Sequence, residues 1–169
     1  EHRKAEDAQP DFEPSAIVVV EDDADLVQLV RRVLSRRLDV PIAVAYTGTG
    51  GIQMAAEHPG ALMLVDYNLP DMLAEQLMAM LRERNIPMEF IVMTGRGDEQ
   101  LAVEMMKSGV RDYLVKDTNF LDRLPSLVEY ALDNISRDRQ LREAESRLQE
   151  NERRLATLME NLPGMAYRC

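Results

Sequence analysis

Four apolar runs in this chain each end on polar residues that carry distinct chemistry. The runs end at Glu21-Asp22-Asp23, Asp66, Thr94 and Lys116. Carboxylates gathered in one cleft repel one another unless a cation neutralises them, and Mg²⁺ prefers such oxygen ligands. An ammonium and a hydroxyl beside the cation would stabilise transferring phosphoryl oxygens. Asp66 would be the nucleophile, because a carboxylate can form an aspartyl-phosphate intermediate.

The elements that must position these residues follow from the same pattern. Short apolar runs that alternate with helical periodicity are typical of buried parallel strands, and ligands bind at the carboxyl ends of such strands. Each of these residues, considered alone, has an ordinary structural interpretation. The acids would be helix N-caps, Thr94 would be the end of a strand, and Lys116 would be a solvated charge. Their position at successive strand ends favours one shared pocket.

Five strand-like segments alternate with helical segments. The strands are expected at 16–20, 42–46, 61–65, 90–93 and 112–115, and helices at about 25–38, 72–84 and 98–107. A short helix is expected after Gly51, and a long helix with Pro125 as one of its early residues. This order predicts an α/β fold: a doubly wound, five-stranded parallel sheet of the flavodoxin-like type, with strand order 2-1-3-4-5 and a long C-terminal helical extension.

Composition restricts the class of protein. The 169 residues are 46% hydrophobic, which suits a globular core, and the apolar runs are too short to span a bilayer. A net charge of −10 argues against nucleic-acid binding, which needs a basic surface. Cys169 is the single cysteine, so an internal disulfide is impossible and a cytoplasmic location is expected. Residues 1–14 are expected to form a mobile leader.

The C-terminal region has the pattern of a long helix. From Leu127 to Asn161 there is neither Gly nor Pro, and half of the residues from Arg137 to Glu160 are charged. One series of residues recurs in steps of three and four, and all but one of its members are apolar: Leu141, Ala144, Leu148, Asn151, Leu155, Leu158 and Leu162. This spacing predicts a coiled-coil linker at 136–160, continuous with the fifth helix, and a parallel homodimer through 136–162. A solvated single helix is the alternative, and the break in the spacing at 136–140 has no explanation in the sequence.

Four segments carry a resemblance to a known family. They are Val18-Val19-Val20-Glu21-Asp22-Asp23, Leu64-Val65-Asp66-Tyr67-Asn68-Leu69-Pro70-Asp71, Val92-Met93-Thr94-Gly95-Arg96-Gly97 and Gly109-Val110-Arg111-Asp112-Tyr113-Leu114-Val115-Lys116. In this order they resemble the receiver domains of bacterial two-component response regulators, over about residues 15–135.

The resemblance implies a phosphorylation site. Asp66 would accept a phosphoryl group from a histidine kinase or phosphotransfer protein, and the domain would catalyse only its own phosphorylation and dephosphorylation. The implied Mg²⁺ ligands are Asp22, Asp66 and the backbone carbonyl of Asn68, with Glu21 acting mainly through water. Thr94, Lys116 and the Gly95 N–H would bind the phosphoryl oxygens, and Tyr113 would be the aromatic switch that moves with Thr94.

Two residues depart from the family pattern. The family usually has proline after its lysine, often through a cis bond, whereas Asp117 follows Lys116 here. A cis bond before a residue other than proline costs about 3 kcal/mol. The sequence therefore does not determine the conformation of this loop or the direction in which the Lys116 side chain points. Gly95 stands where a small residue such as alanine is usual, and it loosens that turn.

A shorter segment near the C-terminus resembles another domain. Residues 155–168 look like the opening helix and first strand of a PAS sensor domain, which would begin at about 161–169. The signal would then pass from the receiver, through the helical linker, to a sensor or output module.

Two other classes of function remain open. An aspartyl-nucleophile phosphatase has a second Asp two residues after its nucleophile, and Asp23 and Asp25 have that spacing. A degenerate receiver that serves only as a dimerisation scaffold is the other, although every reacting group is present.

Overall fold

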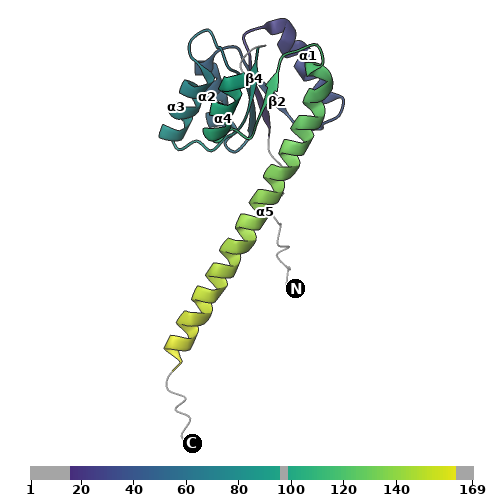
Figure 1. Ribbon diagram of the computed structural model, residues 1–169. Helices are drawn as coiled ribbons and strands as arrows, with labels where there is room; N and C mark the ends of the chain where they lie inside the picture. The colour runs from purple at the N-terminus through teal and green to yellow at the C-terminus, as the bar shows by residue number, and fades with distance from the viewer. Residues whose placement is uncertain (1–15, 96–98, 163–169) are drawn as a thin grey trace, which may run out of the picture.

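A parallel sheet with helices on both faces forms the body of the protein. The computed structural model describes residues 16–95 and 99–162. The strands are β1 (Ile17–Val20), β2 (Ile42–Ala45), β3 (Leu62–Asp66), β4 (Glu89–Thr94) and β5 (Asp112–Val115), and the helices are α1 (Ala24–Ser35), α2 (Gly48–Glu57), α3 (Ala74–Glu83), α4 (Glu99–Lys107) and α5 (Phe120–Asn161). The strand order is β2-β1-β3-β4-β5, all parallel. The predicted fold class is therefore confirmed (Figure 1).

The core lies on both faces of this sheet. Along β1, Val18 and Val20 pack into one apolar cluster, and Ile17 and Val19 pack into the other. The first cluster lies under α2, α3 and α4, and the second lies under α1 and α5 (Figure 1). Because every residue of β1 is buried, its run of β-branched residues is fully used in packing.

Helix α1 begins at an acidic cap beside the carboxyl end of β1. The Asp23 carboxylate accepts hydrogen bonds from the N–H groups of Asp25 (3.0 Å) and Leu26 (3.1 Å), as an N-cap does. The helix ends at Ser35, three residues earlier than expected, and in the turn that follows the N–H groups of Arg37 and Leu38 both donate to the Leu34 carbonyl. The Asp23 cap fixes where the chain leaves β1.

Helix α5 begins earlier than the position of Pro125 suggests. It starts at Phe120, so Pro125 lies in the second turn rather than at the helix start. Burial explains the earlier start, because Phe120 and Leu124 both pack into the cluster beneath α1 and α5. The helix runs without a break to Asn161, where the sequence predicted its end.

The break in the leucine spacing has a structural explanation. At residues 136–140 the helix still contacts the sheet: Asp138 pairs with Arg111 at 3.0 Å, and Arg139 donates to the carbonyl of Gly60. Polar contacts to the body of the domain therefore replace the apolar seam over this stretch. Asp138 is consequently not available for the ion pair with Arg142 that its spacing favours.

Beyond these contacts, residues 140–161 of α5 extend away from the sheet (Figure 1). The leucines of the predicted seam are between 60% and 69% exposed in the single chain: Leu141, Leu148, Leu155, Leu158 and Leu162. Glu150 and Arg154, one helical turn apart, form an ion pair of 2.5 Å. No helix in the described ranges is long and apolar enough to cross a membrane. The predicted leader (1–14) and residues 163–169 of the predicted PAS start lie outside those ranges.

Candidate functional site

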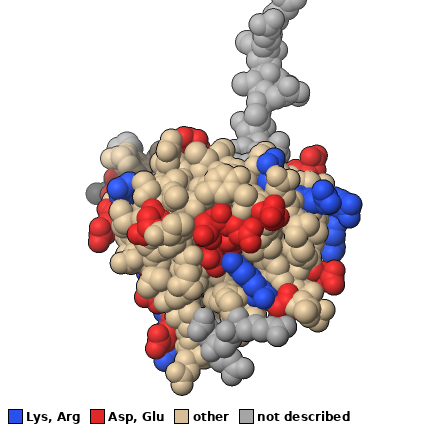
Figure 2. All heavy atoms as spheres, turned by 90° about the horizontal axis from the view of Figure 1, so that it is seen from above, with Lys and Arg blue, Asp and Glu red and all other residues tan. Residues whose placement is uncertain are grey.

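Three carboxylates meet at the carboxyl end of the sheet. Glu21 and Asp22 directly follow β1, and Asp66 is the last residue of the neighbouring strand β3. One oxygen from each of the three lies within 4.8 Å of the others. Glu21 and Asp66 are buried and Asp22 is exposed. Figure 2 shows acidic side chains gathered at the centre of this end of the molecule, with a basic side chain beside them.

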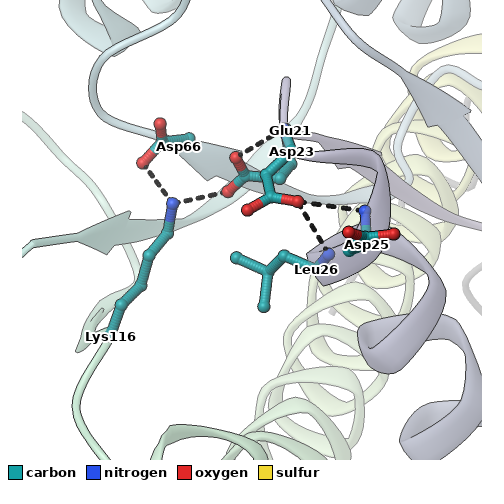
Figure 3. Close-up of polar contacts among 6 residues, drawn as sticks. All are labelled: Glu21, Asp23, Asp25, Leu26, Asp66 and Lys116. Atoms are coloured by element: carbon teal, nitrogen blue, oxygen red, sulfur yellow. Dashed lines mark hydrogen bonds and ion pairs between the residues drawn. The ribbon is translucent and has the colours of Figure 1, made fainter.

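Lys116 enters this cluster from the end of β5. Its ammonium lies 2.5 Å from Glu21 Oε2 and 2.8 Å from Asp66 Oδ1, so it bridges two of the three acids (Figure 3). Burial alone would lower the pKa of Lys116, but hydrogen bonds to Asp66 and Glu21 raise it, so the ammonium stays charged. Burial raises the pKa of Glu21, against the lowering effect of Lys116 and of the Asp23 N–H.

Thr94 and Gly95 lie at the end of the adjacent strand, β4. Thr94 is buried, and its carbonyl accepts a hydrogen bond of 2.7 Å from the Lys116 N–H, which ties the two strand ends together. Gly95 is exposed, and a Cβ placed on it would meet nothing within 4 Å, so the site tolerates alanine there. The Tyr113 side chain, on β5, is partly exposed to solvent.

The loop that carries Asn68 is held by an acid that the sequence analysis did not single out. Asp71 accepts hydrogen bonds from the Gly48 N–H (2.7 Å), the Thr49 N–H (2.9 Å) and the Thr49 hydroxyl (2.7 Å) at the start of α2. The hydrogen bonds from Thr49 and Gly48 lower the pKa of Asp71 to about 2. Asp71 therefore joins the loop after β3 to a different helix. No local pattern in the sequence connects two segments so far apart.

The structure of the loop after Lys116 shows in which direction the lysine side chain points. None of the described residues has a cis peptide bond, and with Asp117 in place of the family's proline the ammonium still reaches Glu21 and Asp66. The Asp117 carboxylate accepts from the Asn119 N–H (2.9 Å) and pairs with Arg123 on α5 (2.9 Å). Arg123 is a further residue that the sequence analysis did not single out.

The arrangement suits a hard divalent cation. Three carboxylates and one ammonium leave the cluster with net negative charge, and Asp22 remains open to solvent. Hard cations of this kind bind through carboxylate oxygens and waters. The donor set therefore fits Mg²⁺, and the ammonium beside Asp66 fits a phosphoryl group.

Comparison with known proteins agrees with this geometry. Residues 17–129 match the model of the response regulator receiver domain. The regulatory protein LuxO of Vibrio cholerae is 32% identical over 119 residues, which cover 70% of this chain and 26% of LuxO. The methanogenesis regulatory protein FilR1 of Methanothrix harundinacea is 35% identical over 123 residues, covering 69% of this chain and 27% of FilR1.

A solved structure shows the same fold. The signal receiver domain of a LuxO repressor protein from Vibrio parahaemolyticus superposes with a TM-score of 0.67 at 27% identity, covering 75% of this chain and 96% of that one. This chain spans only about a quarter of LuxO and FilR1, so the likeness concerns one domain of those proteins. Sheet order, strand-end residues and family match agree: the chain belongs to the response regulator receiver domain family.

Proposed function

We propose that Asp66 accepts a phosphoryl group from the phosphohistidine of a histidine kinase or phosphotransfer protein, in a reaction that needs Mg²⁺. The observation that carries this proposal is the Lys116 ammonium, 2.8 Å from Asp66 inside a cluster of three acids. The domain acts on no separate substrate and catalyses only its own phosphorylation and dephosphorylation.

In the transfer, a carboxylate oxygen of Asp66 bonds to phosphorus while the bond from phosphorus to the donor's imidazole nitrogen breaks. The charge on the phosphoryl oxygens must then be stabilised by donors already in place. Lys116 contacts both Glu21 and Asp66, so its ammonium can turn toward the phosphoryl group and still keep one carboxylate partner. The Thr94 hydroxyl and the Gly95 N–H, at the end of β4, are the further donors.

The acidic cluster would hold the metal. Asp22, Asp66 and the backbone carbonyl of Asn68 would be its ligands, with Glu21 acting mainly through water. When bound, Mg²⁺ neutralises charge between the acids and the incoming phosphoryl group. The exposed position of Asp22 leaves the cluster accessible from solvent.

The output would travel through α5. Phosphorylation adds about −1.5 to −2 charge beside Lys116, and the movement of Thr94 and Tyr113 then biases the face formed by α4, β5 and α5. The exposed leucines of α5, spaced in threes and fours, would pair with a second copy in a parallel dimer. The dimer would pass the signal to a PAS domain and an output module. Cysteine crosslinks placed along Leu141–Leu162 test this, and crosslinks that do not change on phosphorylation would make the helix a passive tether.

The phosphatase alternative assigns the nucleophile to Asp23. That carboxylate is already used as the N-cap of α1, where it accepts two backbone N–H groups. Asp66, by contrast, has a cation as its partner. This difference favours Asp66 as the phosphorylated residue.

Intact mass tests the proposed function. The protein is incubated with Mg²⁺ and acetyl phosphate, and the mass gain of one phosphoryl group is expected in the wild type and in Asp23→Asn, which is the matched control. Asp66→Asn should gain nothing. An adduct that persists in Asp66→Asn, or one lost only in Asp23→Asn, contradicts the proposal. Absence of any adduct in the wild type favours the scaffold alternative.

A further inference from the structure

One side chain contacts both of the residues that flank Lys116. Arg123, in the first turn of α5, donates through Nη2 to the Asp117 carboxylate (2.9 Å) and to the Val115 carbonyl (3.2 Å). Val115 precedes Lys116 and Asp117 follows it. The guanidinium therefore contacts both chain neighbours of the lysine that bridges Glu21 and Asp66.

The backbone around Lys116 is fixed at further points. The Lys116 N–H donates to the Thr94 carbonyl (2.7 Å), and the Asp117 N–H donates to the Val115 carbonyl (2.9 Å). The Asp117 carboxylate also accepts from the Asn119 N–H (2.9 Å). Lysine has a long flexible side chain with several rotatable bonds. The position of its ammonium therefore depends on how firmly its Cα and the direction of its Cβ are held.

We propose that Asp117 and Arg123 are positioning residues for Lys116, which hold the loop between β5 and α5 so that the ammonium faces the phosphoryl group on Asp66. This inference rests on the proposed function and deepens it. It also explains how a chain with Asp117 in place of the family's proline keeps the lysine in the site. Because Arg123 belongs to α5, the pair further connects the phosphoryl-binding lysine to the helix that carries the output.

A positioning role and an ordinary surface ion pair predict different effects when the pair is removed. The Arg123 and Asp117 side chains are 47% and 31% exposed, so the pair by itself contributes little to stability. Small errors in the placement of a reacting group, in contrast, reduce rates strongly. Loss of the pair should therefore appear in the rate of phosphorylation more than in unfolding.

The experiment measures the initial rate of adduct formation on Asp66 with acetyl phosphate at saturating Mg²⁺. In Asp117→Ala and in Arg123→Met we expect the rate to fall about five- to tenfold, since a misplaced ammonium stabilises the transferring oxygens poorly. The Mg²⁺ concentration that gives half the maximal rate should stay within about twofold of wild type, because the metal ligands are untouched. Asp122→Ala, which removes the exposed acid next to Arg123, should behave as wild type.

A double-mutant cycle distinguishes positioning from general loss of structure. In a Lys116→Ala background, Asp117→Ala should slow the reaction no further, because there is no ammonium left to position. Asp117→Asn keeps one oxygen for the Asn119 N–H but replaces the oxygen that accepts from Arg123 with an amide NH2, so its rate should match that of Arg123→Met. Arg123→Met leaves the cap on Asn119 intact, so it reports on the guanidinium even if Asp117→Ala folds poorly.

Each outcome has a defined meaning. Wild-type rates in both Asp117→Ala and Arg123→Met would overturn this inference and leave the proposed function standing. Equal slowing with and without Lys116 would also overturn it, since the effect would then not pass through the lysine. If the wild type takes no adduct at all, the proposed function fails, and the inference fails with it.

Discussion

Strand β5 has a basic residue at each end, and two carboxylates hold each of them. Arg111 precedes the strand and pairs with Glu89 and Asp138, both at 3.0 Å. Lys116 follows the strand and pairs with Glu21 and Asp66. The two cations are equally exposed, at 21% of their side chains, so the difference between the two clusters lies in their acids.

The acids beside Arg111 are 32% and 47% exposed, whereas those beside Lys116 are 2% and 11% exposed. Water can solvate the first pair, and the Arg111 cluster then serves as a joint between the sheet and α5. The second pair is removed from water and shares its ammonium, with Asp22 adjacent. The same arrangement of charges is thus a solvated contact at one end of β5, and at the other end a buried pair of acids held by one ammonium.

The largest expected effect comes from removing the buried cation. Lys116→Met leaves Glu21 and Asp66 facing each other, and should lower the free energy of unfolding by about 2–3 kcal/mol at neutral pH without Mg²⁺. Because the pKa of Glu21 is already raised by burial, the loss should shrink as pH falls and Glu21 takes a proton. Urea unfolding measures both effects.

Added Mg²⁺ should restore part of the stability of Lys116→Met, since a ligand that binds the folded state stabilises it. Lys107→Met, which removes an exposed lysine at the end of α4, is the matched control and should change little. If Lys116→Met keeps the wild-type stability without Mg²⁺, the burial of Glu21 and Asp66 does not make them depend on the ammonium more than the acids beside Arg111 do.

A smaller effect is expected at the other end of β5. Arg111→Gln should lower the free energy of unfolding by about 1 kcal/mol, because its acids return to water. Its response to Mg²⁺ should equal that of the wild type. Arg84→Gln, at an exposed position after α3, is the control. A loss as large as that of Lys116→Met would show that exposure does not separate the two clusters.

Removing one acid of the Arg111 cluster should cost less again. Asp138→Asn leaves Arg111 paired with Glu89, so we expect a loss of about 0.5 kcal/mol. The local effect should be clearer, with faster amide hydrogen exchange at residues 136–142 of α5. Asp133→Asn, on an exposed part of the same helix, serves as the comparison. Unchanged exchange in Asp138→Asn would mean that Arg139 alone holds this stretch.

The smallest effect concerns an acid whose partners carry no charge. Asp71 pairs with N–H and hydroxyl donors of α2, which lower its pKa from 3.8 to about 2. The stabilisation is present above pH 3.8 and is lost as pH falls through about 2. Wild type should therefore exceed Asp71→Asn in urea midpoint at pH 6, and the difference should close near pH 2. A difference that is independent of pH would contradict this assignment.

Elements whose residues act locally could be predicted from the sequence. The β-branched run of β1 and the Asp23 cap of α1 depend on neighbours in the chain, so strand and helix start were placed within a residue or two. The grouping of Glu21, Asp66 and Lys116 followed from the rule that parallel strands end at one edge. The strand, the helix start and the grouping of the three site residues could be predicted because each depends on sequence periodicity, on neighbouring residues or on sheet topology.

Contacts between distant segments could not be predicted in the same way. Asp71 reaches α2, and Arg139 reaches Gly60, across intervals that have no periodic pattern. Pro125 was expected to be an early residue of the long helix, but α5 starts five residues before it because Phe120 is buried. The partners of Asp117 could not be predicted either, because the hydrogen bonds that its carboxylate accepts from the Asn119 N–H and from Arg123 depend on the folded loop.

Asp138 and Arg139 attach α5 to the body of the domain near the middle of this one long helix. From there to Asn161 the helix is about 35 Å long at 1.5 Å per residue. A tilt of about 5° about these contacts would displace the C-terminal end of the helix by about 3 Å, because the displacement grows with the distance from the contacts. A rotation too small to notice beside the sheet would thus become a large displacement at the C-terminal end of α5.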